Sequence, residues 1–240
     1  HQTMAPTEYM YAVPYSWYTE YGIRKYGAHG TSHKYITEYM KNILGRDNVN
    51  LIICHVGSGA SISCIKDGLC FDTSMGLTPL DGLVMGTRSG GVDPSIIKFI
   101  MEETGSDIED VTGMLNKQSG LLGICEKSDF RDMLALKIEG NERANLAYEI
   151  YKKSIIKYIA QYYFELDGVV DAIVFTAGVL ENNVAIREDI VNSLSNTMGV
   201  YLNKEMNDNI GYGKKLDMGM ISRDESKVDV WVVPTNEEIM

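Results

Sequence analysis

Histidine and tryptophan are scarce in this sequence, with four and two residues among 240. The chain has no run of Lys and Arg, and its formal net charge is −11, which disfavours nonspecific binding to nucleic acid or to an anionic membrane. No apolar stretch approaches the roughly 20 residues of a membrane-spanning helix, and no signal-peptide pattern is visible. The composition is that of an ordinary globular protein, in which the few histidines are informative.

The cysteines lack the spacing of a zinc site and lie in apolar segments typical of strands: Cys54, Cys64, Cys70 and Cys125. We expect reduced core thiols and a cytoplasmic protein. At this length the chain can form one large domain, or one domain with a subdomain. It begins at His1 rather than Met and stops directly after a strand-like run, so we expect a piece of a longer polypeptide.

Hydrophobic periodicity predicts alternating helices and strands after an irregular N-terminal segment. Strands are expected at 51–56, 61–66, 69–73, 170–176 and 227–233, and helices at about 31–44, 94–103, 107–117, 128–136, 141–165 and 182–198. Thr31 or Ser32 is the expected N-cap of the first helix, and Asp67 and Gly68 form a hairpin turn. This order predicts an α/β fold that mixes antiparallel and parallel strand pairs.

The segment "HVGSGAS", residues 55–61, joins two expected strands and could hold an anion. Gly57 and Gly59 allow backbone N–H groups to turn toward one point. The segment is neither a Walker A loop nor a dinucleotide fingerprint, because it lacks Gly-Lys-Ser/Thr, a third glycine and a following helix. An ordinary tight turn is the alternative.

Arg88 is isolated among small residues in "MGTRSGG", residues 85–91. Small neighbours would let a phosphoryl group approach the guanidinium closely enough for bidentate binding. The alternative is an exposed loop arginine. The lack of bulky side chains on either side favours a functional role.

Three further segments with candidate binding residues lie at the end of an expected strand or at the start of an expected helix. In "FTAGVLENN" a strand turns into a helix through Gly178, and ligands favour the carboxyl ends of strands in open α/β sheets. "SDFRD" offers Asp129 and Arg131, which also suit the start of a helix with a salt-bridged face. "VVPTNEE" places Asn236 and Glu237 beyond a strand, where a carboxylate could hold Mg²⁺ or simply face solvent.

Two of the four histidines, His29 and His33, lie four residues apart in "KYGAHGTSHKY". A zinc pair is disfavoured because Gly30 intervenes and no further Cys/His cluster exists. Hydrogen-bonded structural histidines are the other alternative. Together, however, these loops offer an anion-binding turn, an isolated arginine, histidines and a carboxylate, without a nucleophile–base pair. Charge-neutralising groups of this kind are what phosphoryl transfer requires.

The sequence closely resembles the acetate kinase family. The matching blocks are "YAVPYSWYTEYGIRKYGAHGTSHKY", "CHVGSGAS", "DTSMGLTPLDGLVMGTRSGGVDP", "FTAGVLEN" and "PTNEE". They cover almost the whole chain, so the resemblance implies that residues 1–240 are the family's C-terminal nucleotide-binding domain without its N-terminal domain. The implied fold is ribonuclease-H-like, a mixed sheet flanked by helices of the type found in actin, sugar kinases and heat-shock chaperone ATPases.

The resemblance implies reversible, in-line transfer of a phosphoryl group from ATP to acetate, which gives acetyl phosphate and ADP. It implies Mg²⁺ or Mn²⁺ as the metal, a cytoplasmic homodimer, and no nucleic-acid or membrane partner. His29 and Arg88 would stabilise the phosphoryl group in flight, and Glu237 would help to place the metal. The implied nucleotide-binding positions are His55, Val56, Gly57, Ser58 and Gly59 for the phosphates, and Asp129, Phe130, Arg131, Gly178, Val179, Leu180, Glu181 and Asn182 for the nucleoside.

Some positions depart from the family pattern. Ser58 stands where Asn is usual, Gly91 where an acidic residue is common, and Leu180 where Gly is usual. We expect an ordinary φ at Leu180 and an isobutyl group that narrows the nucleoside cleft. The family's catalytic aspartate, its carboxylate-binding arginine and one metal ligand lie upstream of the matched blocks, so we expect this chain alone to be inactive.

Two alternatives remain. The chain could be a non-catalytic nucleotide-binding module that acts only with a partner domain, or a relative that uses propionate or pyrophosphate. Acceptor size is set largely in the family's N-terminal half.

Overall fold

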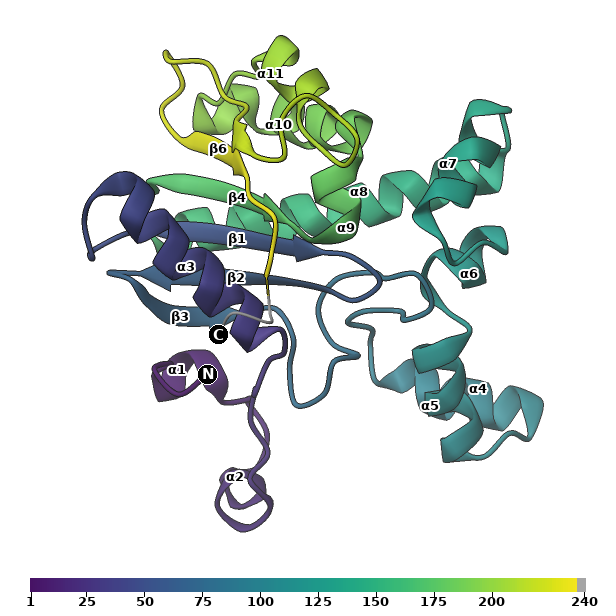
Figure 1. Ribbon diagram of the computed structural model, residues 1–240. Helices are drawn as coiled ribbons and strands as arrows, with labels where there is room; N and C mark the ends of the chain where they lie inside the picture. The colour runs from purple at the N-terminus through teal and green to yellow at the C-terminus, as the bar shows by residue number, and fades with distance from the viewer. Residues whose placement is uncertain (237–240) are drawn as a thin grey trace.

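The structure, a computed structural model, describes residues 1–236 and contains one mixed β-sheet with helices on both faces (Figure 1). Among these residues six strands form the order β3-β2-β1-β4-β6-β5. They are β1 (Leu51–Val56), β2 (Ala60–Lys66), β3 (Leu69–Thr73), β4 (Ala172–Thr176), β5 (Gly219–Met220) and β6 (Asp229–Val232). The β1–β4 and β4–β6 pairs are parallel and the other pairs are antiparallel, which confirms the expected mixture.

The helices connect the strands and cover the sheet. They are α1 (Pro6–Tyr9), α2 (Tyr15–Tyr21), α3 (Gly30–Leu44), α4 (Ser95–Thr104), α5 (Ile108–Lys117), α6 (Gly120–Cys125), α7 (Phe130–Ile138), α8 (Glu142–Glu165), α9 (Ala177–Asn182), α10 (Val184–Met198) and α11 (Lys204–Asn209). In the part of the chain that the structure describes, no helix is long and apolar enough to cross a membrane.

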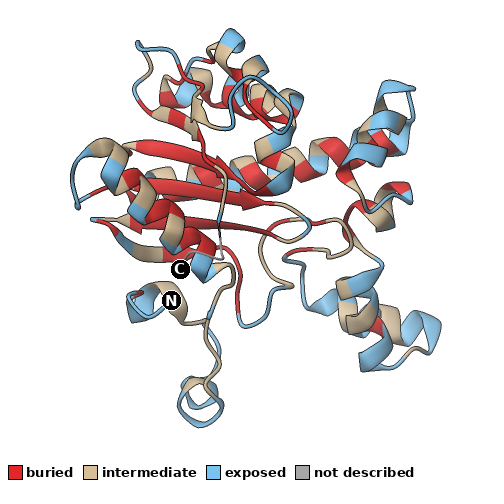
Figure 2. Ribbon diagram, in the orientation of Figure 1, coloured by how far each residue is buried: buried red, intermediate tan, exposed pale blue. Residues whose placement is uncertain are grey.

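Strand alternation divides the core into two parts, because successive side chains point to opposite faces of the sheet. On one face Leu51 and Ile53 of β1 pack with Ile36 and Met40 of α3. On the opposite face Ile52 belongs to a larger cluster that includes the buried side of α8. Figure 2 shows the central strands buried between these two helical layers. Burial of each large apolar side chain contributes about 1.5–3 kcal/mol, so these clusters fix the strand register.

The α3 face of the sheet changes from apolar to polar along the direction of β1. After Leu51 and Ile53 comes His55 on the same face, and its neighbours across the sheet are Ser61 of β2 and Thr176 of β4. All three polar residues are buried. Because buried polar groups need hydrogen-bond partners, this end of the sheet must contain an internal polar network.

The start of α3 differs from the expectation. The prediction of Thr31 or Ser32 as N-cap was wrong: α3 begins at Gly30, and its N-cap is His29 in the left-handed region at φ 56°. The Ser32 hydroxyl is instead buried, where it lies 2.8 Å from His55 Nδ1. The Ser32 hydroxyl therefore forms a tertiary hydrogen bond with His55 instead of capping the helix.

Other differences concern short elements. The sequence showed neither α6 nor α11, and it indicated a turn where α9 stands; six residues are too few to display a helical period. Cys125 consequently lies in α6 rather than in a strand, although all four cysteines are free as expected. The hairpin turn is confirmed, with φ 50° at Asp67 and 75° at Gly68.

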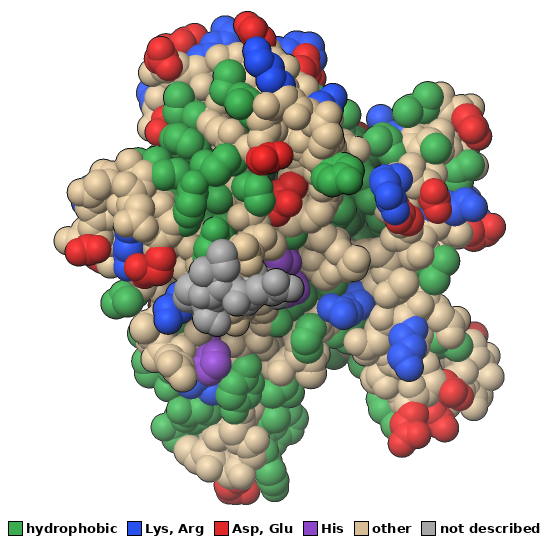
Figure 3. All heavy atoms as spheres, viewed as in Figure 1, with side chains coloured by type: hydrophobic (Ala, Val, Ile, Leu, Met, Phe, Trp, Pro, Cys, Tyr) green, Lys and Arg blue, Asp and Glu red, His purple; other side chains and the backbone are tan. Residues whose placement is uncertain are grey.

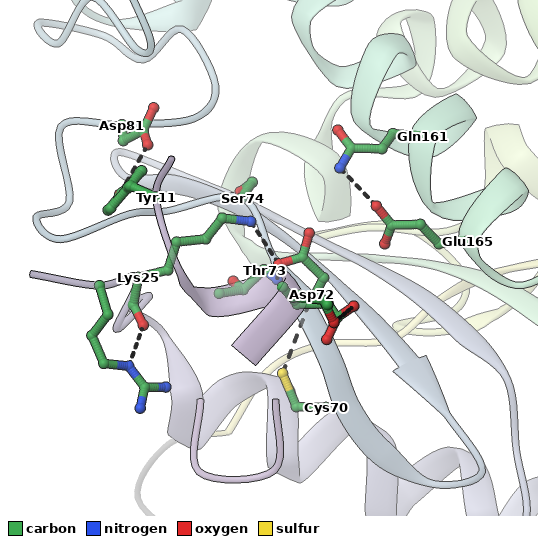
Figure 4. Close-up of polar contacts among 12 residues, drawn as sticks. Tyr11, Lys25, Cys70, Asp72, Thr73, Ser74, Asp81, Gln161 and Glu165 are labelled. Atoms are coloured by element: carbon green, nitrogen blue, oxygen red, sulfur yellow. Dashed lines mark hydrogen bonds and ion pairs between the residues drawn. The ribbon is translucent and has the colours of Figure 1, made fainter. Parts of the chain in front are cut away.

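The segment between α2 and α3 is fastened to β3 by a partly buried ion pair, which Figure 4 shows in close-up. Lys25 Nζ lies 2.8 Å from Asp72 Oδ1, and the Asp72 side chain is only 3% exposed. Burial raises the pKa of Asp72, while the hydrogen bond and charge of Lys25 oppose that rise. The backbone N–H groups of Tyr26 and Gly27 also donate to Gly76 O, so the chain entering His29 is held on two sides.

We predict that Lys25→Met lowers the free energy of unfolding by about 2 kcal/mol, because it leaves the buried Asp72 carboxylate without its partner. Lys98→Met is the control, since Lys98 and Glu102 form an exposed pair at 3.6 Å that contributes less than about 1 kcal/mol. Urea unfolding of both variants measures the difference. Adding Asp72→Asn to Lys25→Met should recover part of the loss. Equal destabilisation by the Lys25 and Lys98 substitutions would contradict this account.

Candidate functional site

The candidate site lies where the parallel strands β1 and β4 end. His55 near the end of β1 is in register with Thr176 at the end of β4, so the segments that follow the two strands meet. A Cβ atom placed on Gly57 would lie 3.5 Å from Ala177 Cβ and 3.7 Å from Gly178 N. The glycine turn and the first residues of α9 are therefore in van der Waals contact. Val56 is buried at the end of β1, and Ser58 is exposed at the tip of the turn.

His29 and Arg88 converge beside Gly59. A Cβ atom on Gly59 would lie 3.1 Å from His29 Nε2 and 3.7 Å from Arg88 Nη1. The two side chains come from segments 59 residues apart in the sequence, and the structure brings them together. Figure 3 shows histidine and basic side chains near the middle of this face of the molecule. A larger residue at position 59 would occupy the space between the two cationic or donor groups.

Three histidine rings form a cluster behind this surface. His29 stacks on His55 with ring centroids 4.1 Å apart and an interplanar angle of 20°, and His33 lies 6.0 Å from His55. Burial, followed by the neighbouring histidines, lowers the pKa of His33 well below its ordinary value. Burial and then the charge of His29 lower the pKa of His55 to about 4. His33 and His55 are therefore neutral near pH 7.

Serine and threonine hydroxyl groups hold these rings in place. Ser61 Oγ lies 2.8 Å from His29 Nδ1 and 2.7 Å from His33 Nε2. Ser32 Oγ joins His55 Nδ1 to Thr235 Oγ1, at 2.8 and 2.7 Å. Sequence reasoning missed all three hydroxyl groups. The available signal was Ser61 and Ser63, two serines on the same face of the buried strand β2. Alternation with a period of two residues would by itself predict that this face is exposed to solvent.

Arg88 is fixed by contacts within its own loop. Its Nη1 donates to Pro79 O at 3.3 Å and contacts Met85 Sδ at 3.5 Å. The loop packs closely on the start of α6, because Leu121 N donates to Met85 O and a Cβ on Gly120 would lie 2.1 Å from that oxygen. Gly120 also has φ 63°, so glycine is required there for two separate reasons.

Two expected nucleoside residues, Glu181 and Asn182, brace α9. One Glu181 carboxylate oxygen accepts hydrogen bonds from Ala177 N at 2.6 Å and Thr235 N at 3.1 Å. Asn182 donates to Gly178 O at 2.9 Å. These side chains thus fix the turn after β4, while Gly178 itself is exposed and a Cβ there would meet nothing within 4 Å.

A buried arginine that the sequence did not reveal also supports α9. Arg187 is 0% exposed, and its guanidinium donates to Leu180 O at 2.9 Å and to Asn207 Oδ1 at 2.7 Å, with further bonds to neighbouring carbonyl groups. Burial lowers its pKa to about 10, so the side chain remains charged at neutral pH. A buried charge bonded to carbonyl oxygens is costly to break and holds α9 against α11.

The expected orientation of Leu180 was wrong. Its side chain is 0% exposed and packs in the main core cluster, so it does not narrow a cleft. The residue lies within α9 in a helical conformation, which agrees with the expected ordinary φ. Because α9 is a helix rather than an open turn, its inner face points to the core. Val179, one residue earlier, is only partly buried.

The other expected nucleoside segment begins α7. Asp129 caps this helix and pairs with Arg131, which lowers the pKa of Asp129 to about 2. Phe130 is 6% exposed and packs on Tyr151 with ring centroids 5.3 Å apart. Within residues 1–236 no hydrogen bond joins this segment to α9. Instead it adjoins the Arg88 loop, since a Cβ on Gly86 would lie 2.5 Å from Ser128 O.

The expected metal ligand, Glu237, lies outside the described residues. Within residues 1–236 no group of three His, Cys, Asp or Glu side chains could hold a metal ion. Mg²⁺ does not require such a group, because it usually keeps several waters and binds through one or two carboxylates and substrate phosphates.

The fold itself defines the class: this is a ribonuclease-H-like α/β protein, with a mixed sheet between helices. The family model of the acetokinase family matches residues 1–240. The chain belongs to the acetokinase family.

Relatives and solved structures agree with this membership. The chain is 47% identical to acetate kinase of Bacillus cytotoxicus and 49% identical to that of Bacillus subtilis, in both cases over its whole length. It superposes on a propionate kinase from Francisella tularensis with a TM-score of 0.93 and 44% identity, over all of this chain and 60% of that one. It superposes on Porphyromonas gingivalis acetate kinase with a TM-score of 0.92 and 43% identity, over 99% of this chain and 59% of that one. The chain spans 59% of the Bacillus cytotoxicus relative and 60% of the Bacillus subtilis relative.

We predict that the free energy of unfolding falls as the pH is lowered from 7 to 5. The unfolded chain takes up protons at histidine near pH 6.5, whereas folded His55 does so only near pH 4. The stabilisation from this residue is therefore complete above pH 6.5 and is lost progressively toward pH 4, for a total of about 3 kcal/mol, and His33 acts in the same direction.

Urea titrations at several pH values, on the original chain and on His55→Gln, measure this dependence. The variant should show a distinctly flatter slope between pH 7 and 5, whatever its absolute stability. The same slope in both proteins would show that folded His55 titrates normally.

Proposed function

We propose that this chain supplies the nucleotide- and phosphoryl-binding part of an enzyme that transfers a phosphoryl group reversibly between ATP and acetate, forming acetyl phosphate. The observation that carries the proposal is the convergence of His29 Nε2 and Arg88 Nη1 on Gly59, next to a glycine turn at the ends of two parallel strands. Family membership supports phosphorylation of a carboxylate. The relatives are longer, so residues 1–240 would act as their C-terminal domain, together with an N-terminal domain.

In this mechanism the protein performs little covalent chemistry. The phosphoryl group in flight is nearly planar and carries negative charge on its three equatorial oxygens. The Arg88 guanidinium can bind two of them in parallel, and His29 can donate one hydrogen bond. Both groups are held by the surrounding loops before the substrate arrives, so little reorganisation is required in the transition state.

The nucleotide would lie along the ends of β1 and β4. Backbone N–H groups of residues 58 and 59 would face the phosphates, because only small residues line this turn, whereas Gly57 N donates to Gly59 O within it. Gly178 and Val179 would lie against the nucleoside, since Gly178 is exposed and its position leaves open space. Asp129 and Arg131 remain candidates on the other side, beside the Arg88 loop.

Bound Mg²⁺ would neutralise phosphate charge, and Glu237 is the residue we assign to its placement. Arg88 and His29 would supply the remaining electrostatic stabilisation.

A homodimer is part of the proposal. Helices α4 and α5 expose four large apolar side chains, which suit a protein contact: Ile96, Phe99, Ile108 and Met114. The other partners would be ATP or ADP and a short carboxylate, in the cytoplasm. Propionate is the second candidate acceptor, because the Francisella tularensis neighbour is a propionate kinase.

We predict that Arg88→Ala in the intact enzyme lowers kcat by about 10³ or more, while the KM for ATP changes much less. The guanidinium is expected to meet most of its negative charge only in the transition state. Arg223→Ala is the matched control, because Arg223 is a largely exposed arginine whose guanidinium lies near Glu225. Steady-state kinetics in the acetyl phosphate direction measure both. A large rise in KM at unchanged kcat would assign Arg88 to ground-state binding.

The 240-residue chain alone is predicted to bind ATP weakly and to form no acetyl phosphate above the blank. It spans 59% of the Bacillus cytotoxicus relative, and the resemblance places the family's catalytic aspartate and carboxylate-binding arginine upstream of the matched blocks. Isothermal titration and a coupled assay test the two halves of this prediction. Turnover near the ordinary enzyme value of about 10 s⁻¹ would overturn it.

Turnover assays of the intact protein separate the enzyme from a non-catalytic nucleotide-binding module. The assays combine ATP or pyrophosphate as phosphoryl donor with acetate or propionate as acceptor. If the intact protein binds ATP but no combination supports turnover, the module is the correct assignment.

A further inference from the structure

A continuous line of hydrogen bonds runs from Ser63 to His29 through the core between α3 and β2. Ser63 Oγ lies 2.7 Å from His33 Nδ1, and His33 Nε2 lies 2.7 Å from Ser61 Oγ. Ser61 Oγ in turn lies 2.8 Å from His29 Nδ1. Ser61 and Ser63 are on the same face of β2, two residues apart, and His33 lies in the first turn of α3. The line reaches the ring whose Nε2 faces Gly59.

The chemistry of these groups allows three arrangements of protons along the line. A hydroxyl group donates one hydrogen, and a neutral imidazole has one N–H donor and one acceptor nitrogen. His33 is neutral because burial lowers its pKa well below the ordinary value. The hydrogens all point toward His29, or all point toward Ser63, or Ser61 accepts from both histidines. The third arrangement is penalised, because Ser61 is 0% exposed and its own hydroxyl hydrogen would be buried without an acceptor.

Ser63 determines which arrangement is favoured. It is 1% exposed, and His33 is its only side-chain hydrogen-bond partner within residues 1–236. If the hydrogens pointed toward Ser63, its own hydroxyl hydrogen would be buried without an acceptor. If they point toward His29, Ser63 donates to His33 Nδ1, and no buried hydroxyl hydrogen of the line lacks an acceptor. Ser63 also lines a cavity of about 820 Å³ beside α3, but its 1% exposure leaves His33 as the partner.

We propose that Ser63, His33 and Ser61 are positioning residues that hold His29 in the tautomer with its proton on Nε2. The Ser61 hydroxyl then donates to His29 Nδ1, and the Nε2–H group faces Gly59 and Arg88. The opposite tautomer would present a lone pair to a phosphoryl oxygen and repel it. The value of this tautomer for catalysis rests on the proposed function; the tautomer itself does not.

The first test is ¹⁵N NMR of the intact protein labelled at its histidine rings. At pH 8 an imidazole of ordinary pKa is neutral, so each nitrogen is either protonated or a bare acceptor, and the two give well-separated shifts. We expect a protonated Nε2 and an acceptor Nδ1 in both His29 and His33. Assignment follows from the loss of signals in single histidine variants. A protonated Nδ1 at His29 would overturn the proposal.

The second test removes the residue that sets the direction. In Ser63→Ala the reversed line leaves the buried His33 Nδ1–H without an acceptor, and the forward line leaves that nitrogen without a donor, so a preference of about fivefold or more for one tautomer should weaken. Ser63→Thr retains the hydroxyl and should retain the spectrum of the original protein. Ser222→Ala is the matched control, because Ser222 is a buried serine that accepts from Val230 N, away from the histidines. It should alter stability without altering the His29 signals.

Kinetics of the same variants separate this proposal from the proposed function. If the His29 tautomers mix in Ser63→Ala, kcat should fall by about twofold with the KM for ATP unchanged, and Ser63→Thr should restore it. Mixed tautomers with unchanged kcat would support the hydrogen-bond line and contradict the phosphoryl-binding role of His29. An unchanged His29 spectrum in Ser63→Ala would contradict the line, whatever the rate.

Discussion

The parallel pairing of β1 with β4 is the constraint on which the site depends. It aligns His55 with Thr176, so that the glycine turn after one strand contacts the first residues of α9 after the other. A slip of one residue in β1 would move His55 from the α3 face into the apolar core against α8, because successive side chains point to opposite faces. The register is held by Leu51, Ile53 and their apolar neighbours, so the packing of the core fixes the position of the polar residues at its edge.

The buried polar side chains on the α3 face of the sheet form hydrogen bonds with one another rather than with solvent. Ser32 joins His55 to Thr235, and Ser61 joins His29 to His33. Each bond contributes only about 1 kcal/mol, but an unpaired buried group would cost more, so the network resists partial opening. Three segments that are distant in sequence, at α3, β2 and the end of β6, are thereby fixed relative to one another.

Much of this arrangement could be predicted from the sequence. The buried run of β1, the glycine turn and the long helix α8 each have a strong local signal, and the isolated Arg88 was visible from its small neighbours. The residues that support the site had no strong local signal in the sequence. Ser61 and Ser63 have the alternation of a solvent-facing strand, and Arg187 resembles any surface arginine on a helix until α11 packs over it. Leu180 was assigned to a cleft because the sequence indicated a turn, whereas the six-residue helix α9 directs its side chain into the core.

The distribution of charge follows from the same burial. His33 and His55 are kept neutral by their surroundings, which allows the His55 ring to stack on His29 without electrostatic repulsion. Arg88, on a loop that also reaches Gly59, supplies permanent positive charge at the site. An anion bound there would meet one fixed cation and one oriented hydrogen-bond donor, and the donor's orientation would be set by neutral hydroxyl groups rather than by ion pairs. Because neutral hydrogen bonds are screened little by salt, the orientation of the His29 ring should depend less on ionic strength than the exposed charges of this acidic protein do.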